Sequence, residues 1–299
     1  MNDIDNIQVN FSENLWVLNF CLSFIMFGVA LDLKKEDFIK LIQDPKTALA
    51  GIFSQYLLFP FIAFLFIKIM QPHPSIALGL LLVVVCPSGN ISNFLTHTAN
   101  GNIALAVSLT GISTVLAPVT APFLFTFYAN LDTGMSSVLQ SFHIGFLEML
   151  QSVSVLLLLP ILLAMFLNYK FPAFILKIKK SVKILSLLIF IAFLVFAFKA
   201  NFEIFKQYVH LVLLVVFILD LMGFVAGFYS GKLFGLNYAD CKTLSIETGI
   251  HNAGLGLVLV FSFFGGLGGM ALVAAWWGIW HLIAGMILAN YWKRKAATN

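Results

Sequence analysis

Charged residues are scarce in this sequence. Asp, Glu, Lys and Arg together make up 10% of its 299 residues, whereas a soluble domain carries about 25%. Hydrophobic residues make up 61%, and Phe alone occurs 32 times. So few charges do not suffice to cover the surface of a soluble monomer. The composition therefore predicts an integral membrane protein. The net charge of +4, without a basic helix or an aromatic platform, also excludes a nucleic-acid-binding protein.

Cysteine is nearly absent. Cys21, Cys86 and Cys241 lie far apart, in or beside apolar segments, with no CxxC pair and no metal-ligand spacing. The sequence thus excludes a disulfide framework and predicts inert, buried thiols. A basic segment before the first apolar run is lacking as well, because the N-terminus reads MNDIDNIQVNFSEN. We therefore expect no cleaved signal peptide.

Long apolar runs, in contrast, are abundant and predict an all-α polytopic membrane protein. Each run has about 17–27 residues, which suits a hydrocarbon core of about 30 Å. We expect nine spans, at residues 15–33, 47–69, 75–98, 102–128, 142–168, 183–199, 208–230, 240–264 and 269–292. The charged segments 34–46 and 169–182 are interpreted as loops.

The basic residues predict the orientation in the membrane. With the N-terminus outside, only Lys68, Lys199 and Lys206 of the 17 Lys and Arg residues fall on the outer side. Lys183 is then assigned to the cytoplasmic loop before the sixth span. Cytoplasmic loops of membrane proteins carry an excess of Lys and Arg, so we expect an outer N-terminus and a cytoplasmic C-terminus. The compact chain suits a bacterial inner membrane.

Two of the expected spans are interrupted. Residues 86–90 read Cys-Pro-Ser-Gly-Asn, and residues 245–254 contain Glu247 with two Gly and one Asn. Pro removes a backbone donor, Gly permits unusual backbone angles, and a carboxylate within a membrane is costly unless it is paired, protonated or bound to a cation. The interrupted spans are the middle ones of two three-span units that begin on opposite sides of the membrane. Such paired interruptions indicate the midplane binding site of a transporter.

The half-helices at these interruptions suggest what is bound. The N-termini of the helices that restart near Ser92 and near Ala253 carry partial positive charge and free N–H groups, which favour an anion. Glu247 and the carbonyls before the breaks favour a hard cation such as Na⁺. The arrangement therefore suits the co-transport of a carboxylate with sodium.

Motifs at both interruptions resemble those of a known family. Cys-Pro-x-Gly-x-x-Ser-Asn occupies 86–93, Glu-x-Gly-x-x-Asn-x-Gly occupies 247–254, and Trp280-His281 follows. Together they resemble the bile acid:sodium symporter (BASS) family over nearly the whole chain. The resemblance implies an inverted-repeat core with two discontinuous crossing helices, packed against a panel domain. It divides the chain into 1–46 (panel helix and cytoplasmic loop), 47–130 (first core repeat), 131–200 (panel helices) and 201–299 (second core repeat and short cytoplasmic tail).

The resemblance also implies binding residues. The first sodium site carries over onto Ser92, Asn93, Thr110 and Glu247, while a further Ser of the family falls on Ala106. The second sodium site carries over onto Gln55, Glu247, Thr248, Ile250 and His251, where His251 replaces a Gln of the family. The substrate positions carry over onto Asn90, Ile91, Asn252 and His281.

The implied function is sodium-coupled symport of an organic anion, bile-acid-like or a smaller carboxylate, by alternating access. Na⁺, the organic anion and the lipid bilayer are then the partners, with no nucleic acid and no obligate protein partner. Proton coupling through His251 or through Asp220, a carboxylate at the centre of the seventh span, is an open alternative. A non-transporting sensor and an intramembrane enzyme are the alternatives of another class. The sequence lacks the metalloprotease and Ser/His signatures that such an enzyme requires.

Overall fold

The computed structural model describes residues 3–5, 7, 15–31, 44–89, 91–142, 146–200 and 202–297, and every regular element in them is helical. Beyond a short 3₁₀ turn at Asp3–Asp5 and a π-helical segment, η2 (Phe53–Leu58), the elements are α-helices. These are α1 (Leu15–Ala30), α3 (Pro45–Ile52), α4 (Phe59–Met70), α5 (Pro74–Val85), α6 (Ile91–Thr98), α7 (Ile103–Asn130), α8 (Thr133–Ser141), α9 (Phe146–Lys170), α10 (Pro172–Ala200), α11 (Phe202–Leu233), α12 (Tyr238–Gly249), α13 (Ala253–Phe263) and α14 (Gly268–Ala297).

Five stretches of the described chain are long and apolar enough to cross a bilayer: Pro45–Met70, Ile103–Asn130, Val153–Lys170, Phe202–Leu233 and Gly268–Lys295. Three further apolar helical stretches are shorter: Asn19–Gly28, Pro74–Val85 and Ala253–Phe263. Among them, α5 and α13 have 12 and 11 residues, too few to span a hydrocarbon core alone. Each is separated by a break from another short helix: α6 follows α5, and α12 precedes α13. The integral membrane character expected from composition is therefore confirmed.

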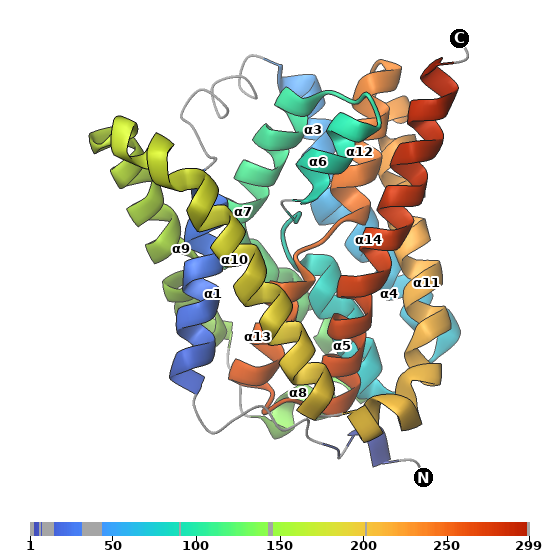
Figure 1. The fold of residues 1–299 in the computed structure, drawn as a ribbon. Coiled ribbons are helices and arrows are strands. Elements are labelled where there is room, and N and C mark those ends of the chain that lie inside the picture. The colour runs from blue at the N-terminus through green and yellow to red at the C-terminus, as the bar shows by residue number, and fades with distance from the viewer. Residues whose placement is uncertain are drawn as a thin grey trace.

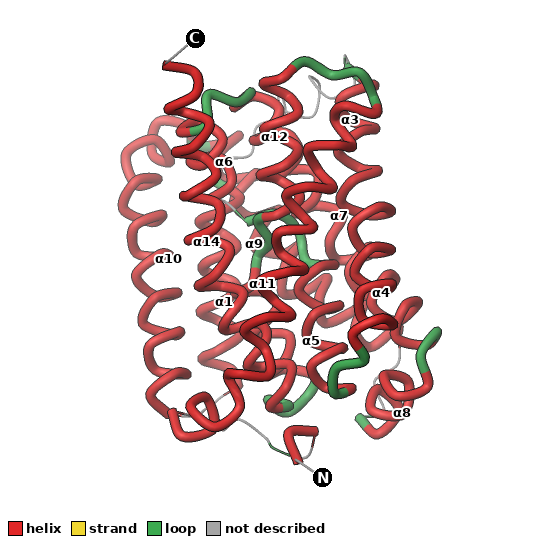
Figure 2. Tube along the Cα trace, turned by 90° about the vertical axis from the view of Figure 1, so that its right-hand side faces the viewer, coloured by secondary structure: helices red, strands yellow, loops and turns green. Residues whose placement is uncertain are grey.

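The two helix breaks occur where the sequence predicts them. α5 ends at Val85, because Cys86 is extended and Pro87 has no N–H to continue the helix. α12 ends at Gly249, and Asn252 begins α13 by accepting a hydrogen bond from the backbone N–H of Leu255 at 3.0 Å. Figure 1 shows both breaks near the middle of the molecule, and Figure 2 shows loop segments at its two ends and at its centre.

The breaks are joined by backbone hydrogen bonds. The N–H of Gly89 donates to the carbonyl of Ile250 at 3.1 Å, and the N–H of Asn252 donates to the carbonyl of Pro87 at 2.8 Å. Ser88 and His251 thereby form an isolated antiparallel bridge. Non-helical backbone at membrane depth needs such partners, because lipid provides none. The two breaks thus provide hydrogen-bond partners for each other's backbone groups.

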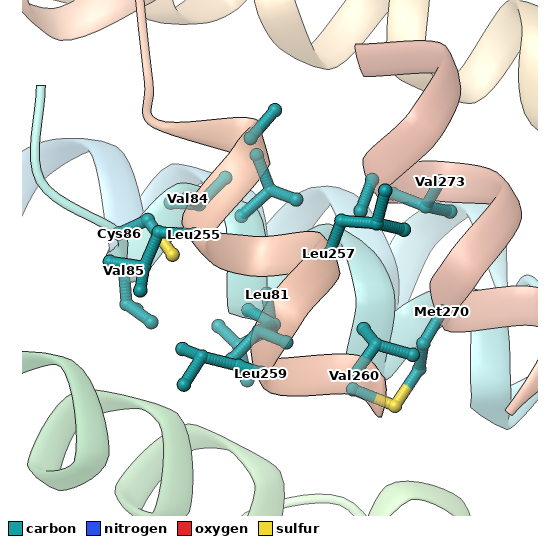
Figure 3. Packing of buried hydrophobic residues seen from close by; sticks show 14 of the residues in the cluster. Leu81, Val84, Val85, Cys86, Leu255, Leu257, Leu259, Val260, Met270 and Val273 are labelled. Atoms are coloured by element: carbon teal, nitrogen blue, oxygen red, sulfur yellow. The ribbon is translucent and has the colours of Figure 1, made fainter. Parts of the chain in front are cut away.

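Close helix packing surrounds the breaks. Figure 3 shows Leu81 of α5, Leu257 and Val260 of α13, and Met270 and Val273 of α14 gathered in one buried cluster. On the other side, α11 lies directly against α12. A Cβ atom at Gly227 would stand 2.2 Å from the carbonyl oxygen of Leu244, so only glycine fits there.

A group of three helices, α1, α9 and α10, lies on the left of Figure 1, beside the breaks. α10 departs from the expectation, because residues 172–182 were expected in a loop and are helical. Pro172 starts the helix at a position where its missing N–H costs nothing, and Ala173, Leu176 and the Lys residues that follow are good helix formers. Lys183 consequently lies well inside a helix. α8 and η2 were not expected either.

Candidate functional site

Glu247 lies at the centre of the molecule and is fully buried. Its Oε1 atom accepts a hydrogen bond of 2.5 Å from the Ser92 hydroxyl of α6. The Thr110 hydroxyl of α7 lies 3.0 Å from Oε2 and 3.2 Å from Oε1. Because the carboxylate belongs to α12, three helices meet at it. Among the described residues, no basic side chain forms a salt bridge with it.

Two further serines, which were not among the expected site residues, are linked to this carboxylate through Ser92. The Ser88 hydroxyl lies 3.3 Å from the Ser92 hydroxyl and 3.2 Å from the carbonyl of Ile250. The Ser113 hydroxyl accepts a hydrogen bond of 3.3 Å from the backbone N–H of Ser88. Ser88 lies within the first interruption, so its position in that motif could have identified it as a site residue.

The remaining residues of the expected first sodium site lie on the same helices. Asn93 follows Ser92 on α6, and its Oδ1 atom is buried without a hydrogen-bond partner. Ala106, one turn before Thr110 on α7, is fully buried and offers no side-chain oxygen. The Glu247 carboxylate and the Ser92 and Thr110 hydroxyls form a set of oxygen donors that suits a hard cation, and the unpartnered Asn93 is the next residue along α6. The residues present therefore fit a sodium ion.

Two residues of the expected second site, Gln55 and Thr248, lie where η2 meets α12. Gln55 of η2 donates from Nε2 to the backbone carbonyl of Glu247 at 3.4 Å. Ser54, which the sequence reasoning missed, lies 2.9 Å from the Thr248 hydroxyl through its own hydroxyl. No sequence motif marks Ser54, since only the π-helical turn brings it to α12. Such π-helical turns occur frequently at functional sites.

Two members of that second set have other surroundings. The carbonyl of Ile250 already accepts from the Gly89 N–H and lies 3.2 Å from the Ser88 hydroxyl. The His251 ring is buried, with its centroid 5.4 Å from that of Phe59 and 6.1 Å from that of Trp277. The structure thus brings Gln55, Glu247 and Thr248 together, whereas His251 lies among aromatic rings.

A cavity of about 410 Å³ lies between α1 and α10 on one side and the breaks, α13 and α14 on the other. Three of the four expected substrate residues, Ile91, Asn252 and His281, line it, and Asn90 lies outside the described residues. The side chain of Asn252 also approaches Met26 of α1, with Nδ2 3.9 Å from Sδ. The volume is within the range of small-molecule sites.

The two candidate proton-binding residues are separate. Asp220 lies in the middle of α11, is fully buried, and has no hydrogen-bond partner at either carboxyl oxygen. His251 lies at the second break, and its Nδ1 atom is also unpartnered. Within the described part of the chain, no hydrogen bond or ion pair joins the two side chains. Asp220 and His251 would therefore have to bind protons independently of each other.

Comparisons with known proteins agree on one family. The Sodium Bile acid symporter family matches residues 19–208. The chain is similar to "Uncharacterized sodium-dependent transporter YocS" of Bacillus subtilis, with 33% identity over 276 residues that cover 92% of this chain and 82% of that protein. It is 31% identical to "Probable sodium/metabolite cotransporter BASS1, chloroplastic" of Arabidopsis thaliana, covering 92% of this chain and 66% of that protein. It is 26% identical to "Sodium-dependent organic anion transporter" of Bos taurus, covering 85% of this chain and 71% of that protein.

Proposed function

This chain belongs to the sodium bile acid symporter family, and from that premise we propose that it moves an organic anion across the membrane together with sodium. The family and the named relatives are sodium-dependent transporters rather than enzymes. The observation that carries the proposal is the surroundings of Glu247: a fully buried carboxylate at the helix breaks, held by hydroxyls from two other helices.

In this proposal, Glu247 couples the ion to the substrate. A carboxylate in a membrane interior is costly while it lacks a compensating positive charge. Sodium bound by Glu247, Ser92, Asn93 and Thr110 would supply that charge and draw α6, α7 and α12 together. The same breaks line the cavity through Gly89, His251 and Asn252. Sodium binding, by ordering the two breaks, would therefore shape the cavity wall that the anion touches at Ile91, Asn252 and His281.

A second sodium ion is proposed at Gln55, Glu247, Thr248, Ile250 and His251. The carbonyl of Ile250 already accepts a hydrogen bond from the N–H of Gly89. A carbonyl oxygen has two lone pairs, so the ion would share this oxygen with the Gly89 N–H.

We propose alternating access for the movement itself. The chain crosses the membrane nine times, with an outer N-terminus and a cytoplasmic C-terminus, in a bacterial inner membrane. Residues 47–130 and 201–299 form two inverted repeats. Residues 1–46 and 131–200 supply the panel, which includes α1, α9 and α10, and the cavity lies where this panel meets the repeats. Movement of one body against the other would expose the cavity to each side in turn.

Thermal unfolding in detergent tests the sodium site without a known substrate. Ligand that binds only the folded state raises its stability, by about 2.7 kcal/mol at 100 times Kd. We expect NaCl to raise the Tm of the wild type relative to KCl at equal ionic strength, and Glu247→Ala to abolish the difference. An equal Tm in both salts at every pH would contradict the proposal.

Proton coupling is the second candidate, because Asp220 is a fully buried carboxylate without a hydrogen-bond partner. Proteoliposomes distinguish the two candidates when uptake of a panel of radiolabelled carboxylates is driven either by a sodium gradient or by a pH gradient. Uptake driven by the pH gradient without sodium, and lost in Asp220→Asn, would favour protons. Uptake driven by sodium and retained in Asp220→Asn supports the first proposal.

A further inference from the structure

A second hollow lies on the surface of the molecule, between α11 and the segment formed by η2 and α4. It has a volume of about 570 Å³ and shares no described lining residue with the cavity at the helix breaks. Figure 1 shows α4 and α11 side by side at the right-hand edge, on the side of the molecule opposite α1 and α9. We call this hollow the α11 groove.

The spacing of side chains on α11 accounts for the shape of the groove. Small side chains, Ala226 and Ser230, are buried and form its floor. Phe53, Leu58 and Ile62 supply the opposite wall. Positions four apart share a helix face, and a ridge of side chains that are 47% to 74% exposed recurs with this period beside the floor: Leu221, Val225, Tyr229 and Leu233.

The groove offers almost no hydrogen bonds. The Ser230 hydroxyl is the polar group of the floor, and it donates to the carbonyl of Ala50 at 3.2 Å. None of the described lining residues is charged. A ligand therefore binds here through van der Waals contact along its length. An alkyl chain meets this requirement.

The length of the groove matches one leaflet of a bilayer. Leu233 is the last residue of α11, and Leu221 lies near the middle of this 32-residue helix. The twelve residues between these positions correspond to about 18 Å of helix, and half of a hydrocarbon core is about 15 Å. The groove thus extends from the helix end to about the depth that an acyl chain reaches.

Two lysines lie at the end of the groove where a lipid headgroup would be. Lys232 precedes Leu233, and its ammonium lies 5.7 Å from the ring centroid of Tyr229. Lys46 reaches the same end from α3, where its ammonium donates to the carbonyl of Gly235 at 3.3 Å. Both side chains are exposed. Two ammonium groups beside an apolar groove match the charge of an anionic phospholipid.

The acidic side chains described at this end have other partners. Asp44 accepts a hydrogen bond from the backbone N–H of Thr47, and Asp240 accepts from the side chains of Asn102 and Asn237. Among the described residues, neither Lys46 nor Lys232 forms a salt bridge. The two ammonium groups are therefore not neutralised by these carboxylates.

We propose that the α11 groove binds an anionic phospholipid, with one acyl chain along Ala226 and Ser230 and the phosphate between Lys46 and Lys232. The orientation proposed above places this end in the cytoplasmic leaflet, whose surface is negatively charged. The inference concerns the lipid-facing surface of α11. It does not depend on the transported substrate or on the coupling ion.

An ordinary boundary lipid makes a different prediction. Apolar side chains on a membrane protein contact lipid everywhere, and lysines near helix ends extend toward the headgroup region along an apolar stem. If nothing more happened at the α11 groove, no single lipid would be preferred there. A headgroup preference that depends on Lys46 and Lys232 therefore separates the two cases.

Native mass spectrometry of the detergent-purified protein measures this preference. The probes are phosphatidylglycerol and phosphatidylcholine with identical oleoyl chains, and the readout is the Kd of the first bound lipid. We expect phosphatidylglycerol to bind more tightly. Lys46→Gln and Lys232→Gln should each weaken its binding by about fivefold, the effect of one Lys near an anionic lipid surface. Both variants should leave the Kd of phosphatidylcholine unchanged.

The matched control is Lys206→Gln, which removes an exposed lysine near the other end of α11. It should bind phosphatidylglycerol as the wild type does. Equal affinity of the wild type for both lipids would overturn the inference. So would an unchanged affinity for phosphatidylglycerol when Lys46→Gln and Lys232→Gln are combined.

A second variant tests the groove itself. Ala226→Leu fills the floor and should weaken the binding of phosphatidylglycerol. Val119→Phe enlarges an exposed apolar side chain of α7 outside the groove and should not. If Ala226→Leu does not fold, Leu233→Ala lowers the exposed ridge instead, with the same expectation. Unchanged binding in the folded groove variant would overturn the inference.

The same spectra test the other candidate occupant of the groove, a second copy of this chain. They report the mass of the assembly together with its bound lipid. A dimer that Ala226→Leu dissociates would assign the groove to a protein contact and overturn the inference. A monomer that retains phosphatidylglycerol supports it.

Discussion

The backbone N–H of Asn252 donates a hydrogen bond of 2.8 Å to the carbonyl of Pro87, and this bond joins the two helix breaks. α5 ends just before Cys86 and Pro87, and Asn252 caps the start of α13. A backbone N–H of one break thus provides the hydrogen-bond partner for a backbone carbonyl of the other. The site at Glu247 consequently depends on the pairing of both breaks. Any movement of α12 relative to α5 would have to rearrange this pairing.

Removal of the Thr110 hydroxyl should weaken sodium binding. Thr110→Val keeps the size of the side chain but leaves Glu247 with one hydroxyl partner fewer. We expect the concentration of NaCl that gives half of the Tm increase to rise about tenfold or more, and the Tm in KCl to fall, corresponding to about 1–3 kcal/mol. Titration of Tm against NaCl measures both.

The matched control is Thr126→Val on the same helix. The Thr126 hydroxyl donates to the carbonyl of Pro122 at 2.7 Å, within α7 and away from Glu247. Its removal should leave the sodium titration unchanged. A normal sodium titration in Thr110→Val would exclude Thr110 as a ligand.

Lys242 should be required for stability rather than for ion selectivity. Its ammonium is buried and donates to the carbonyls of Ala99 and Asn100 at 2.5 and 2.6 Å, just after the C-terminus of α6. Charge-assisted bonds to the carbonyls at a helix end are strong. We expect Lys242→Met to destabilise the protein by about 2–3 kcal/mol, measured as a lower Tm in KCl, whereas sodium still raises the Tm. An unaltered Tm would argue against this role, and Lys232→Met serves as the control.

The α11–α12 contact should not tolerate a side chain at Gly227. An added Cβ would stand 2.2 Å from the carbonyl oxygen of Leu244, and a backbone atom has no rotamer through which to move away. We expect Gly227→Ala to cost about 3 kcal/mol or more, seen as a lower Tm and a reduced yield of folded protein. Gly278→Ala is the control, because its Cβ would meet Ala253 at an ordinary 3.5 Å. Equal Tm values for the two variants would refute the argument.

Acid should remove one stabilising contact at the end of the molecule where α4 and α8 meet. The Lys68 ammonium donates a hydrogen bond to Asp132, and this bond, followed by one from the backbone N–H of Met135, holds the pKa of Asp132 below its ordinary value. A carboxyl whose pKa is lower in the folded state stabilises it above the unfolded pKa of about 4 and loses that effect as pH falls through the folded pKa.

Asp132→Asn tests this contact while keeping the N-cap of α8, since Asn is also a good cap. We expect the variant to have a Tm lower than the wild type by on the order of 1 °C at pH 7, because exposed ion pairs contribute little. The difference should shrink below about pH 4. A difference that is constant from pH 7 to pH 3 would show that the charge of Asp132 is not responsible.

Much of the site could be predicted because its signals are local in the chain. Pro87 and Gly89 interrupt a helix whatever surrounds them, and a carboxylate such as Glu247 in an apolar run needs partners wherever it lies. The resemblance then selected Ser92 and Thr110, which the structure places on Glu247. The sequence did not predict Ser54, because only the π-helical turn of η2 directs it toward Thr248.

The sequence by itself determined that the chain is helical, lies in a membrane and is broken at two places, because hydrophobicity, Pro and Gly act on the segment that contains them. Only the tertiary structure decided what those segments meet. The Glu247 hydroxyl partners come from residues more than 100 positions away, and Lys183, expected in a loop, lines the cavity because α10 begins at Pro172 and packs on Gly28. Such pairings depend on how whole helices pack, which the residues of one helix cannot specify alone.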